Sequence, residues 1–181
     1  MQIDFHKEFK GGVGKQHPYI YRKIKEYCGR MPSTYSLLDY GCGLGGTADW
    51  LEREFPGIFI QRYDPYIPEY SEFVNRYYSY VYSLDCLEHI PREDCIKKGG
   101  ALAWINSCTS NYAFLVIDLT KAKKSLPDGT NAHVNLQSAE AWIRDIELWM
   151  PVVEWEIDEQ PDKTYGTRKR LCVTARRGKK M

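Results

Sequence analysis

The stretch LLDYGCGLGG, residues 37–46, decides the fold of this chain. Two leucines and Asp39 lead into four glycines within six positions. An apolar run that ends in closely spaced glycines predicts a buried strand, a tight turn and the start of a helix. Unpaired backbone N–H groups collect at such a helix start, so we expect this turn to bind a ligand.

Strands and helices alternate along the chain on both sides of the turn. Apolar runs predict strands over residues 35–40, 57–64, 78–85 and 112–120. The spacing of apolar residues predicts helices over 17–28, 47–55, 91–108 and 138–150, the third interrupted at Gly99-Gly100, and at best a short helix over 68–76. Continuous apolar strands with helices between them predict a mostly parallel sheet that is covered on both faces.

The end of the chain has a different pattern. Residues 152–158 and 168–176 alternate between apolar and polar side chains, and the short segment between them contains Pro161 and Gly166, which predicts an antiparallel hairpin. The residues expected to face inward are Val153, Trp155 and Ile157 on the first strand and Leu171, Val173 and Ala175 on the second. The acids expected to pair with the bases at 168–170 are Glu154, Glu156 and Asp158.

The fold class that follows is α/β: a Rossmann-like, doubly wound, mostly parallel sheet with a C-terminal antiparallel hairpin. The length of 181 residues predicts one domain over 1–181, with a flexible N-terminal segment over 1–16 and a basic tail over 177–181. KGGVGK, residues 10–15, resembles part of a phosphate-binding P-loop. Gln16 follows it where the motif needs Ser or Thr, so we expect no phosphate site there.

The composition is that of an ordinary soluble globular protein. The formal net charge is +1, so whole-chain charge gives no reason to expect a nucleic-acid or membrane partner. No two of the six cysteines have C-x-x-C spacing, and most lie in apolar runs, which favours a reducing compartment over a disulfide framework. The charged N-terminus does not resemble a signal peptide, and no apolar run is long enough for a membrane span, so we expect a cytoplasmic protein.

Four carboxylates lie at or near the ends of four predicted strands. They are Asp39, Asp64, Asp85 and Asp118. Because ligands of such sheets bind at the carboxyl ends of the strands, we expect these side chains to surround the ligand.

The charge of Asp39 bears on which cofactor the glycines serve. Gly41, Gly43 and Gly46 match the dinucleotide pattern G-x-G-x-x-G, but a carboxylate two positions before the first glycine would repel a diphosphate. A cofactor with an ammonium group and a sulfonium would be attracted instead. Asp64 can accept hydrogen bonds from ribose hydroxyls of either cofactor, so it does not separate the two alternatives.

LLDYGCGLGG, then RYDP (62–65), then VYSLDCLEHIPRED (81–94) resemble class I methyltransferases that use S-adenosylmethionine (SAM). The most similar subgroup is that of ubiquinone-biosynthesis methyltransferases, whose corresponding segment reads much like LEHIP. The resemblance covers roughly residues 35–120, and the hairpin fits the last two strands of that family. It implies three contact regions for SAM: Asp39 with Gly41, Gly43 and Gly45 at the methionine part, Asp64 at the ribose, and Leu84 with Asp85 near the methyl group.

One departure from the family lies after Asp64. Only 14 residues, 65–78, stand where the family fits a helix, a strand and an adenine-contacting acid. We therefore expect the family's third strand to be short or missing here, and the adenine contact cannot be assigned.

The candidates for proton transfer are histidines. His133 follows the most apolar strand, beside Asn131 and Asn135, and a neutral imidazole there could take a proton from a substrate; a solvent-exposed loop histidine is an equal alternative. Glu88 and His89 could act as an acid–base pair; the alternatives are that they cap the helix that begins near Pro91, or that His89 is a structural histidine with satisfied hydrogen bonds. No metal-ligand cluster is evident, so we expect no metal.

These observations lead to a functional hypothesis. The chain is expected to transfer a methyl group from SAM to an O, N or C nucleophile of a small molecule, or of a sugar or lipid precursor. Residues 1–30 and 119–136 would form a lid over the site. The alternatives are an NAD-dependent oxidoreductase that uses the overlapping glycine pattern, and a SAM-binding module without activity. The sequence does not indicate an oligomeric state.

Overall fold

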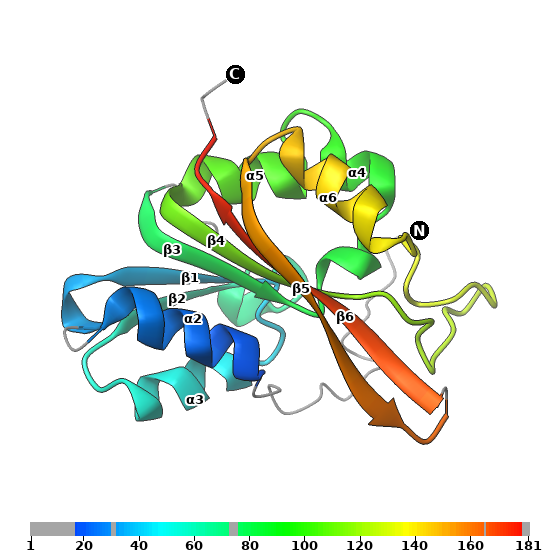
Figure 1. Ribbon diagram of the computed structural model, residues 1–181, viewed down its shortest axis with the longest axis horizontal. Coiled ribbons are helices and arrows are strands. Elements are labelled where there is room, and N and C mark those ends of the chain that lie inside the picture. The colour runs from blue at the N-terminus through cyan, green and yellow to red at the C-terminus, as the bar shows by residue number, and fades with distance from the viewer. Residues whose placement is uncertain (1–16, 30–31, 73–75, 165, 179–181) are drawn as a thin grey trace.

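The computed structural model describes residues 17–29, 32–72, 76–164 and 166–178. Within them the strands form one six-stranded sheet in the order β2-β1-β3-β4-β6-β5. Their bounds are β1 Ser36–Tyr40, β2 Phe59–Tyr63, β3 Tyr78–Leu84, β4 Thr109–Asp118, β5 Val152–Asp162 and β6 Gly166–Arg176. The first four strands are parallel, and β6 is antiparallel to both β4 and β5. The predicted fold class is confirmed (Figure 1).

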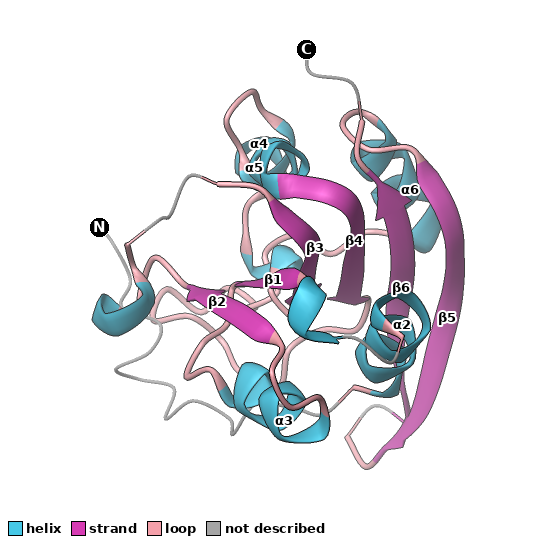
Figure 2. Ribbon diagram, turned by 90° about the vertical axis from the view of Figure 1, so that its left-hand side faces the viewer, coloured by secondary structure: helices cyan, strands magenta, loops and turns pink. Residues whose placement is uncertain are grey.

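The helices cover both faces of the sheet (Figures 1 and 2). One core packs β3, β4 and β6 against α4 (Arg92–Ile96), α5 (Ala101–Cys108) and α6 (Ala139–Glu147). The other packs the opposite face against α2 (Pro18–Cys28) and α3 (Gly46–Glu54). On β4, Leu115 and Ile117 belong to the first core, whereas Phe114 and Val116 belong to the second. This alternation explains why the strand is continuously apolar from Ala113 to Ile117.

The segment between β2 and β3 is short, as expected. Where the structure describes it, it contains a single 3-10 turn, η2 (Pro68–Tyr70), and no strand. As a result β2 lies at the edge of the sheet, and β1 lies between β2 and β3. The third strand of the methyltransferases that the sequence resembles is absent from the described residues.

Local signals set the helix boundaries. Ser138 accepts a hydrogen bond from the Ala141 N–H (3.3 Å) and caps α6, as its position predicts. The predicted helix over 91–108 divides into α4 and α5 at the glycine pair. Gly99 has φ 76°, and a Cβ on Gly100 would lie 2.3 Å from the Asp94 carbonyl oxygen. The chain therefore needs glycine at both positions to turn from one helix into the next.

One expectation for the hairpin was wrong, and a second was confirmed only in part. Val153 and Trp155 are 52% and 47% exposed, because β5 is the outer strand of the sheet and a register shift between Val152 and Glu154 interrupts its alternation. Across the hairpin, Glu159 of β5 pairs with Lys169 of β6 at 2.8 Å, as the pattern predicts, but Glu154 and Glu156 pair with another element. Helix α2 lies against β5, so Glu156 pairs with Arg22, and Glu154 with Lys23. The arginines of β6 point to the carboxyl ends of β3 and β4 instead.

Among the described residues, no helix combines the length and the apolar character needed to cross a bilayer. The segment KGGVGK lies outside the described residues.

Candidate functional site

The glycine turn at the end of β1 has the predicted strand–turn–helix geometry. Gly41, Gly43 and Gly45 all have positive φ, at 76°, 53° and 80°, a conformation that side chains disfavour. The N–H groups of Gly41 and Cys42 donate to the Tyr63 carbonyl oxygen at 2.8 and 3.1 Å, which fixes the turn to the end of β2. Helix α3 starts at the next residue, Gly46. The turn is therefore held by the backbone.

Neighbouring side chains close the turn at two of its glycines and leave the third open. A Cβ on Gly41 would lie 2.2 Å from Cys86 Sγ, and one on Gly45 would lie 2.9 Å from the Arg62 side chain. A Cβ on Gly43 would meet nothing within 4 Å. The backbone at Gly43 is therefore where a ligand can approach the turn.

Asp64 lies against this open point. One carboxylate oxygen accepts a hydrogen bond from the Gly43 N–H at 3.0 Å, and the other accepts from the Tyr66 N–H at 3.0 Å. The side chain is buried although it follows the edge strand β2. The sequence placed Asp64 at the end of this strand, and the structure brings it into contact with the turn.

Asp39 lies beneath the turn rather than on its surface. It is 2% exposed, and its Oδ2 has no hydrogen-bond partner among the described residues. Burial raises the pKa of Asp39 to about 7, although the nearby Tyr82 hydroxyl and Arg62 favour the charged form. A positive charge above the turn would lower that pKa again, because it stabilises the carboxylate.

Asp85 and Asp118 are neutralised by arginines of β6. The Arg170 guanidinium donates to both oxygens of Asp85 at 2.8 and 3.0 Å, and Arg168 donates to Asp118 and to Asp85. Asp85 has φ 49°, an uncommon conformation outside glycine, which this bidentate contact helps to hold. Leu84, just before it, is half-buried. The four predicted carboxylates therefore differ, since two carry counter-charges.

Sequence reasoning missed both arginines. Arg170 is the register partner of Asp118 across the β4–β6 pair. The alternating pattern of residues 168–176 predicted the strand. Its bases could be assigned to the site only once the strand was known to lie beside β4.

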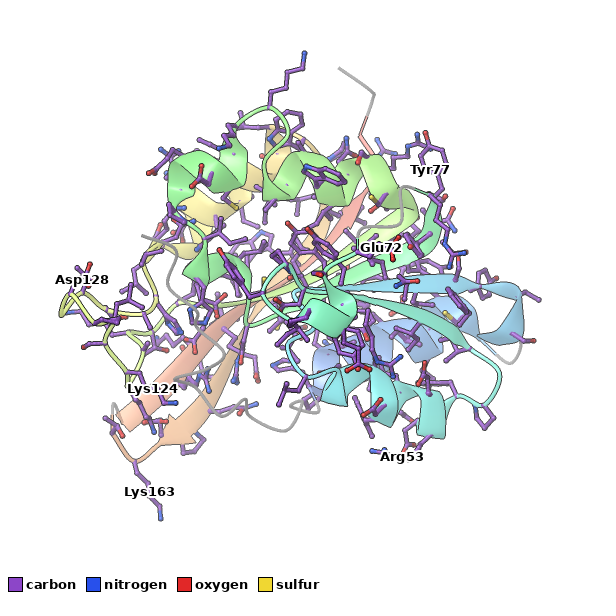
Figure 3. All side chains as sticks on the ribbon, turned by 180° about the vertical axis from the view of Figure 1, so that it is seen from behind. Arg53, Glu72, Tyr77, Lys124, Asp128 and Lys163 are labelled. Atoms are coloured by element: carbon purple, nitrogen blue, oxygen red, sulfur yellow. The ribbon has the colours of Figure 1, made fainter. Side chains whose placement is uncertain are left out.

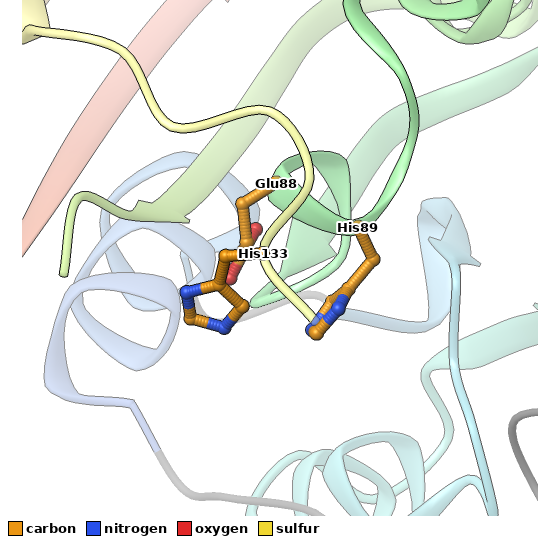
Figure 4. A group of neighbouring side chains, drawn as sticks. All are labelled: Glu88, His89 and His133. Atoms are coloured by element: carbon orange, nitrogen blue, oxygen red, sulfur yellow. The ribbon is translucent and has the colours of Figure 1, made fainter. Parts of the chain in front are cut away.

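Two further side chains join His133 at the same edge of the sheet. Glu88 and His89 lie in the short turn η3 (Leu87–His89) after β3, and His133 lies in the loop after β4 (Figure 4). The rings of His89 and His133 meet edge to face with centroids 4.8 Å apart. Glu88, His89 and His133 each offer one atom that could bind a metal ion, and these three atoms lie within 4.8 Å of one another. We call Asp85, Glu88, His89, Asp118 and His133 the acid–histidine cluster.

The environment of the cluster is buried and hydrogen-bonded. His89 Nδ1 lies 2.9 Å from the Ala132 carbonyl oxygen, and His133 Nδ1 lies 2.5 Å from that of Thr120. Burial, and secondarily His133, lowers the pKa of His89. Burial and the nearby Asp85 hold the pKa of Glu88 well above its ordinary value. Neither residue caps α4, whose N-cap position is Pro91 without a side-chain bond, so the capping alternative was wrong. His133 is buried, so it is not a solvent-exposed loop histidine.

A cavity of about 250 Å³ opens beside the cluster. His89, His133 and Asp118 line it together with basic residues, which include Lys121, Lys124 and Arg168. The 119–136 loop that carries two of these lysines extends away from the sheet, as Lys124 and Asp128 show on the side opposite Tyr77 (Figure 3).

Comparison with known proteins gives a fold but no family by sequence. No protein-family model matches the chain, and no curated protein matches it. Several solved structures with the same fold are methyltransferases. Phosphoethanolamine N-methyltransferase 2 of Haemonchus contortus, crystallised with SAM, has a TM-score of 0.62 and 13% identity over 97% of this chain and 56% of its own.

Two other neighbours match over nearly their whole length. A SAM-dependent methyltransferase of Methanosarcina mazei has a TM-score of 0.61 and 10% identity over 90% of this chain and 98% of its own. The 16S rRNA (adenine(1408)-N(1))-methyltransferase of Catenulisporales acidiphilia has a TM-score of 0.57 and 14% identity over 93% and 94%. A mitomycin 7-O-methyltransferase also has this fold. The present chain spans 54% of the length of that enzyme and 56% of the length of the Haemonchus enzyme. At these identities the likeness shows the fold.

Proposed function

We propose that this protein is a SAM-dependent methyltransferase that acts on a small molecule. The observation that carries the proposal is the open point at Gly43, which is flanked by Asp64 and lies above the buried Asp39. A ligand that approaches there meets backbone and carboxylates. The neighbours of the same fold that were crystallised with SAM or its demethylated product support the choice of cofactor.

The residues fit SAM better than a dinucleotide. Within the described residues, the basic side chain nearest the turn is Arg62, which is already paired with Asp49 (2.6 Å) and Glu52 (2.8 Å) of α3. A diphosphate would face two carboxylates without an additional cation, whereas the ammonium group of SAM would be attracted. Asp39, Gly41, Gly43 and Gly45 would hold the methionine part, and Asp64 the ribose hydroxyls.

Bound SAM supplies a methyl group on a positively charged sulfur, which is transferred in line to the acceptor atom. The protein's part is to hold the acceptor in line with the methyl group and to exclude water. Leu84 is the last residue of β3, which pairs with β1, and Asp85 of the acid–histidine cluster follows it directly, so both lie at the strand ends beside the glycine turn. His133 is the proposed base, because its Nδ1 faces a carbonyl oxygen and its lone pair is therefore on Nε2.

The cavity beside the cluster supports a small acceptor. Its volume is about 250 Å³, and basic and acidic side chains both line it, with Arg168 paired to Asp118 and Lys123 to Asp162. The rRNA-acting neighbour keeps an RNA acceptor as an outcome that the experiment must test.

Ligand binding separates the two SAM-binding hypotheses from the oxidoreductase. We expect the demethylated cofactor to raise the melting temperature and NAD to leave it unchanged; stabilisation by NAD alone would support the oxidoreductase. Asp39→Ala should lose affinity for the demethylated cofactor while the circular dichroism spectrum stays native. Asp94→Ala, on the distant helix α4, is the matched control.

Transfer is tested with labelled SAM against pools of small acids, phenols and amines, and against RNA. Transfer to a small-molecule pool is the expected result. Transfer to RNA would overturn the substrate class, and cofactor binding without transfer to any pool would support the non-catalytic module.

A further inference from the structure

We propose that Glu88, His89 and His133 form a binding site for a divalent transition-metal ion, with zinc as the favoured ion. The three residues come from two segments 44 positions apart, the turn after β3 and the loop after β4. Their donor atoms lie within 4.8 Å of one another (Figure 4). No metal was expected from the sequence, because the spacing of these residues matches no metal-binding motif.

Both imidazoles are oriented as metal-ligating histidines are. A carbonyl oxygen only accepts hydrogen bonds, so the contacts of His89 with Ala132 (2.9 Å) and of His133 with Thr120 (2.5 Å) place the proton on Nδ1 in each ring. The lone pair is then on Nε2. A histidine that donates its other N–H to a backbone carbonyl is the usual arrangement around zinc, because it fixes the tautomer and the ring orientation.

Glu88 is an independent observation that points to a cation. It is 0% exposed, and neither carboxylate oxygen has a hydrogen-bond partner among the described residues. A carboxyl group without a hydrogen-bond partner is costly in such a place whether it is neutral or ionised, and native proteins rarely keep one. A bound cation would stabilise its carboxylate form.

The donor set indicates the kind of ion. Two imidazoles and one carboxylate suit zinc, iron or manganese, whereas magnesium prefers oxygen ligands alone. The neighbouring group of Asp85, Glu88 and Asp118 is all oxygen, but arginines already neutralise two of its members. Ligands of one zinc ion lie about 3.3 Å apart, so side-chain rotations that close the cluster by up to about 1.5 Å suffice.

Three protein ligands leave at least one coordination position for another molecule. If the proposed methyl transfer is correct, on which this step rests, that position would hold an acceptor oxygen. The hydroxyl proton goes to solvent when the oxygen binds the ion, the oxygen then forms a bond to the methyl carbon, and the carbon–sulfur bond breaks with its electron pair remaining on sulfur. His133 would then act as a ligand, and no separate base would be needed.

Metal uptake by the full chain, prepared without a histidine tag, is the direct test. We expect one equivalent of zinc per chain by equilibrium dialysis and elemental analysis. With Co²⁺ as the probe we expect a visible d–d spectrum without a thiolate charge-transfer band, which excludes the six cysteines as ligands. Acetohydroxamate, an oxygen-donor probe, should shift that spectrum; no shift would overturn the open coordination position.

Two ligand variants and one control sharpen the test. Glu88→Gln and His133→Ala should each lower zinc affinity by about 100-fold or more, since even outer partners of ligands are worth 10–100-fold. Glu88→Gln keeps the side-chain shape, so a native circular dichroism spectrum is expected with it. The control is His17→Asn, which replaces the histidine at the N-cap of α2. Because asparagine is also a good N-cap residue, we expect the helix to be kept and zinc uptake to be unchanged.

The metal site is overturned if the folded wild type takes up no zinc, manganese or cobalt at concentrations far above its own, or if both variants take up as much as the wild type. Binding of the demethylated cofactor is measured separately in the presence of a chelator. Zinc uptake without cofactor binding would overturn the proposed function but not the site, and the converse result would overturn only the site.

Discussion

The glycine turn and the acid–histidine cluster occupy the same edge of one sheet, yet they are built in different ways. The turn is made by residues 39–46 and by Asp64, and backbone N–H groups make most of its contacts. The cluster draws side chains from residues 85–89, from residue 118, from the loop at 133 and from the arginines of β6. One region depends on local backbone geometry, and the other on the pairing of buried charges across the fold.

This difference shows where each region is vulnerable. A turn held by backbone hydrogen bonds tolerates loss of nearby side chains but does not tolerate added ones. A cluster of buried charges has the opposite behaviour, because removal of one partner leaves another charge uncompensated. Four substitutions test this contrast, in order of decreasing expected effect.

The largest effect is expected at Arg170, which neutralises Asp85. Arg170→Met should lower the free energy of unfolding by about 3 kcal/mol, because a largely buried carboxylate loses its bidentate partner and keeps the longer contact with Arg168. Urea denaturation measures the loss. Adding Asp85→Asn in the same chain should recover part of it; a double variant as unstable as the sum of the two single variants would contradict the pairing.

The second effect depends on pH and concerns Asp39 beneath the turn. Its pKa in the fold is about 7 against an ordinary 3.8, so its contribution to stability is complete below pH 3.8 and is lost as the pH rises through 7. Asp39→Asn has no such loss. Its advantage over the wild type in the free energy of unfolding should grow by up to about 2–3 kcal/mol between pH 5 and pH 8. An advantage independent of pH would show that Asp39 titrates normally.

The third effect is at Gly41, where the two regions touch. Gly41→Ala would place a Cβ 2.2 Å from Cys86 Sγ at φ 76°, and should cost about 2–3 kcal/mol through overlap and backbone strain. Thermal and urea denaturation of Gly41→Ala, Cys86→Gly and the double variant form a cycle. Removing the Cys86 side chain should reduce the cost of alanine at 41, and purely additive costs would contradict the contact.

The smallest effect is expected at Arg62, which like Arg170 contacts both oxygens of one carboxylate, here Glu52, but lies beside the turn. Its partners Asp49 and Glu52 are 55% and 37% exposed, so Arg62→Met should cost about 1 kcal/mol or less. The same urea measurement compares the two arginines directly. Equal costs would remove the distinction between the two regions.

Much of the fold could be predicted from the sequence because its signals are local. The glycine spacing after Leu37-Leu38 predicted the strand, the turn and the helix. The short segment after Asp64 predicted that no full strand lies between β2 and β3. The hairpin was also predicted, but the faces of its first strand were not. Whether Val153 is buried depends on what lies beside β5, which alternation along one strand does not specify.

The sequence by itself determined the parallel sheet, the closing hairpin and the glycine turn with Asp64 near it, since each follows from periodicity or from the conformational freedom of glycine within a few residues. Only the tertiary structure decided that Arg168 and Arg170 neutralise Asp118 and Asp85, and that Glu88 and His89 meet His133. Those contacts join side chains more than 40 positions apart. They arise from strand order and register, which no local pattern in the chain encodes.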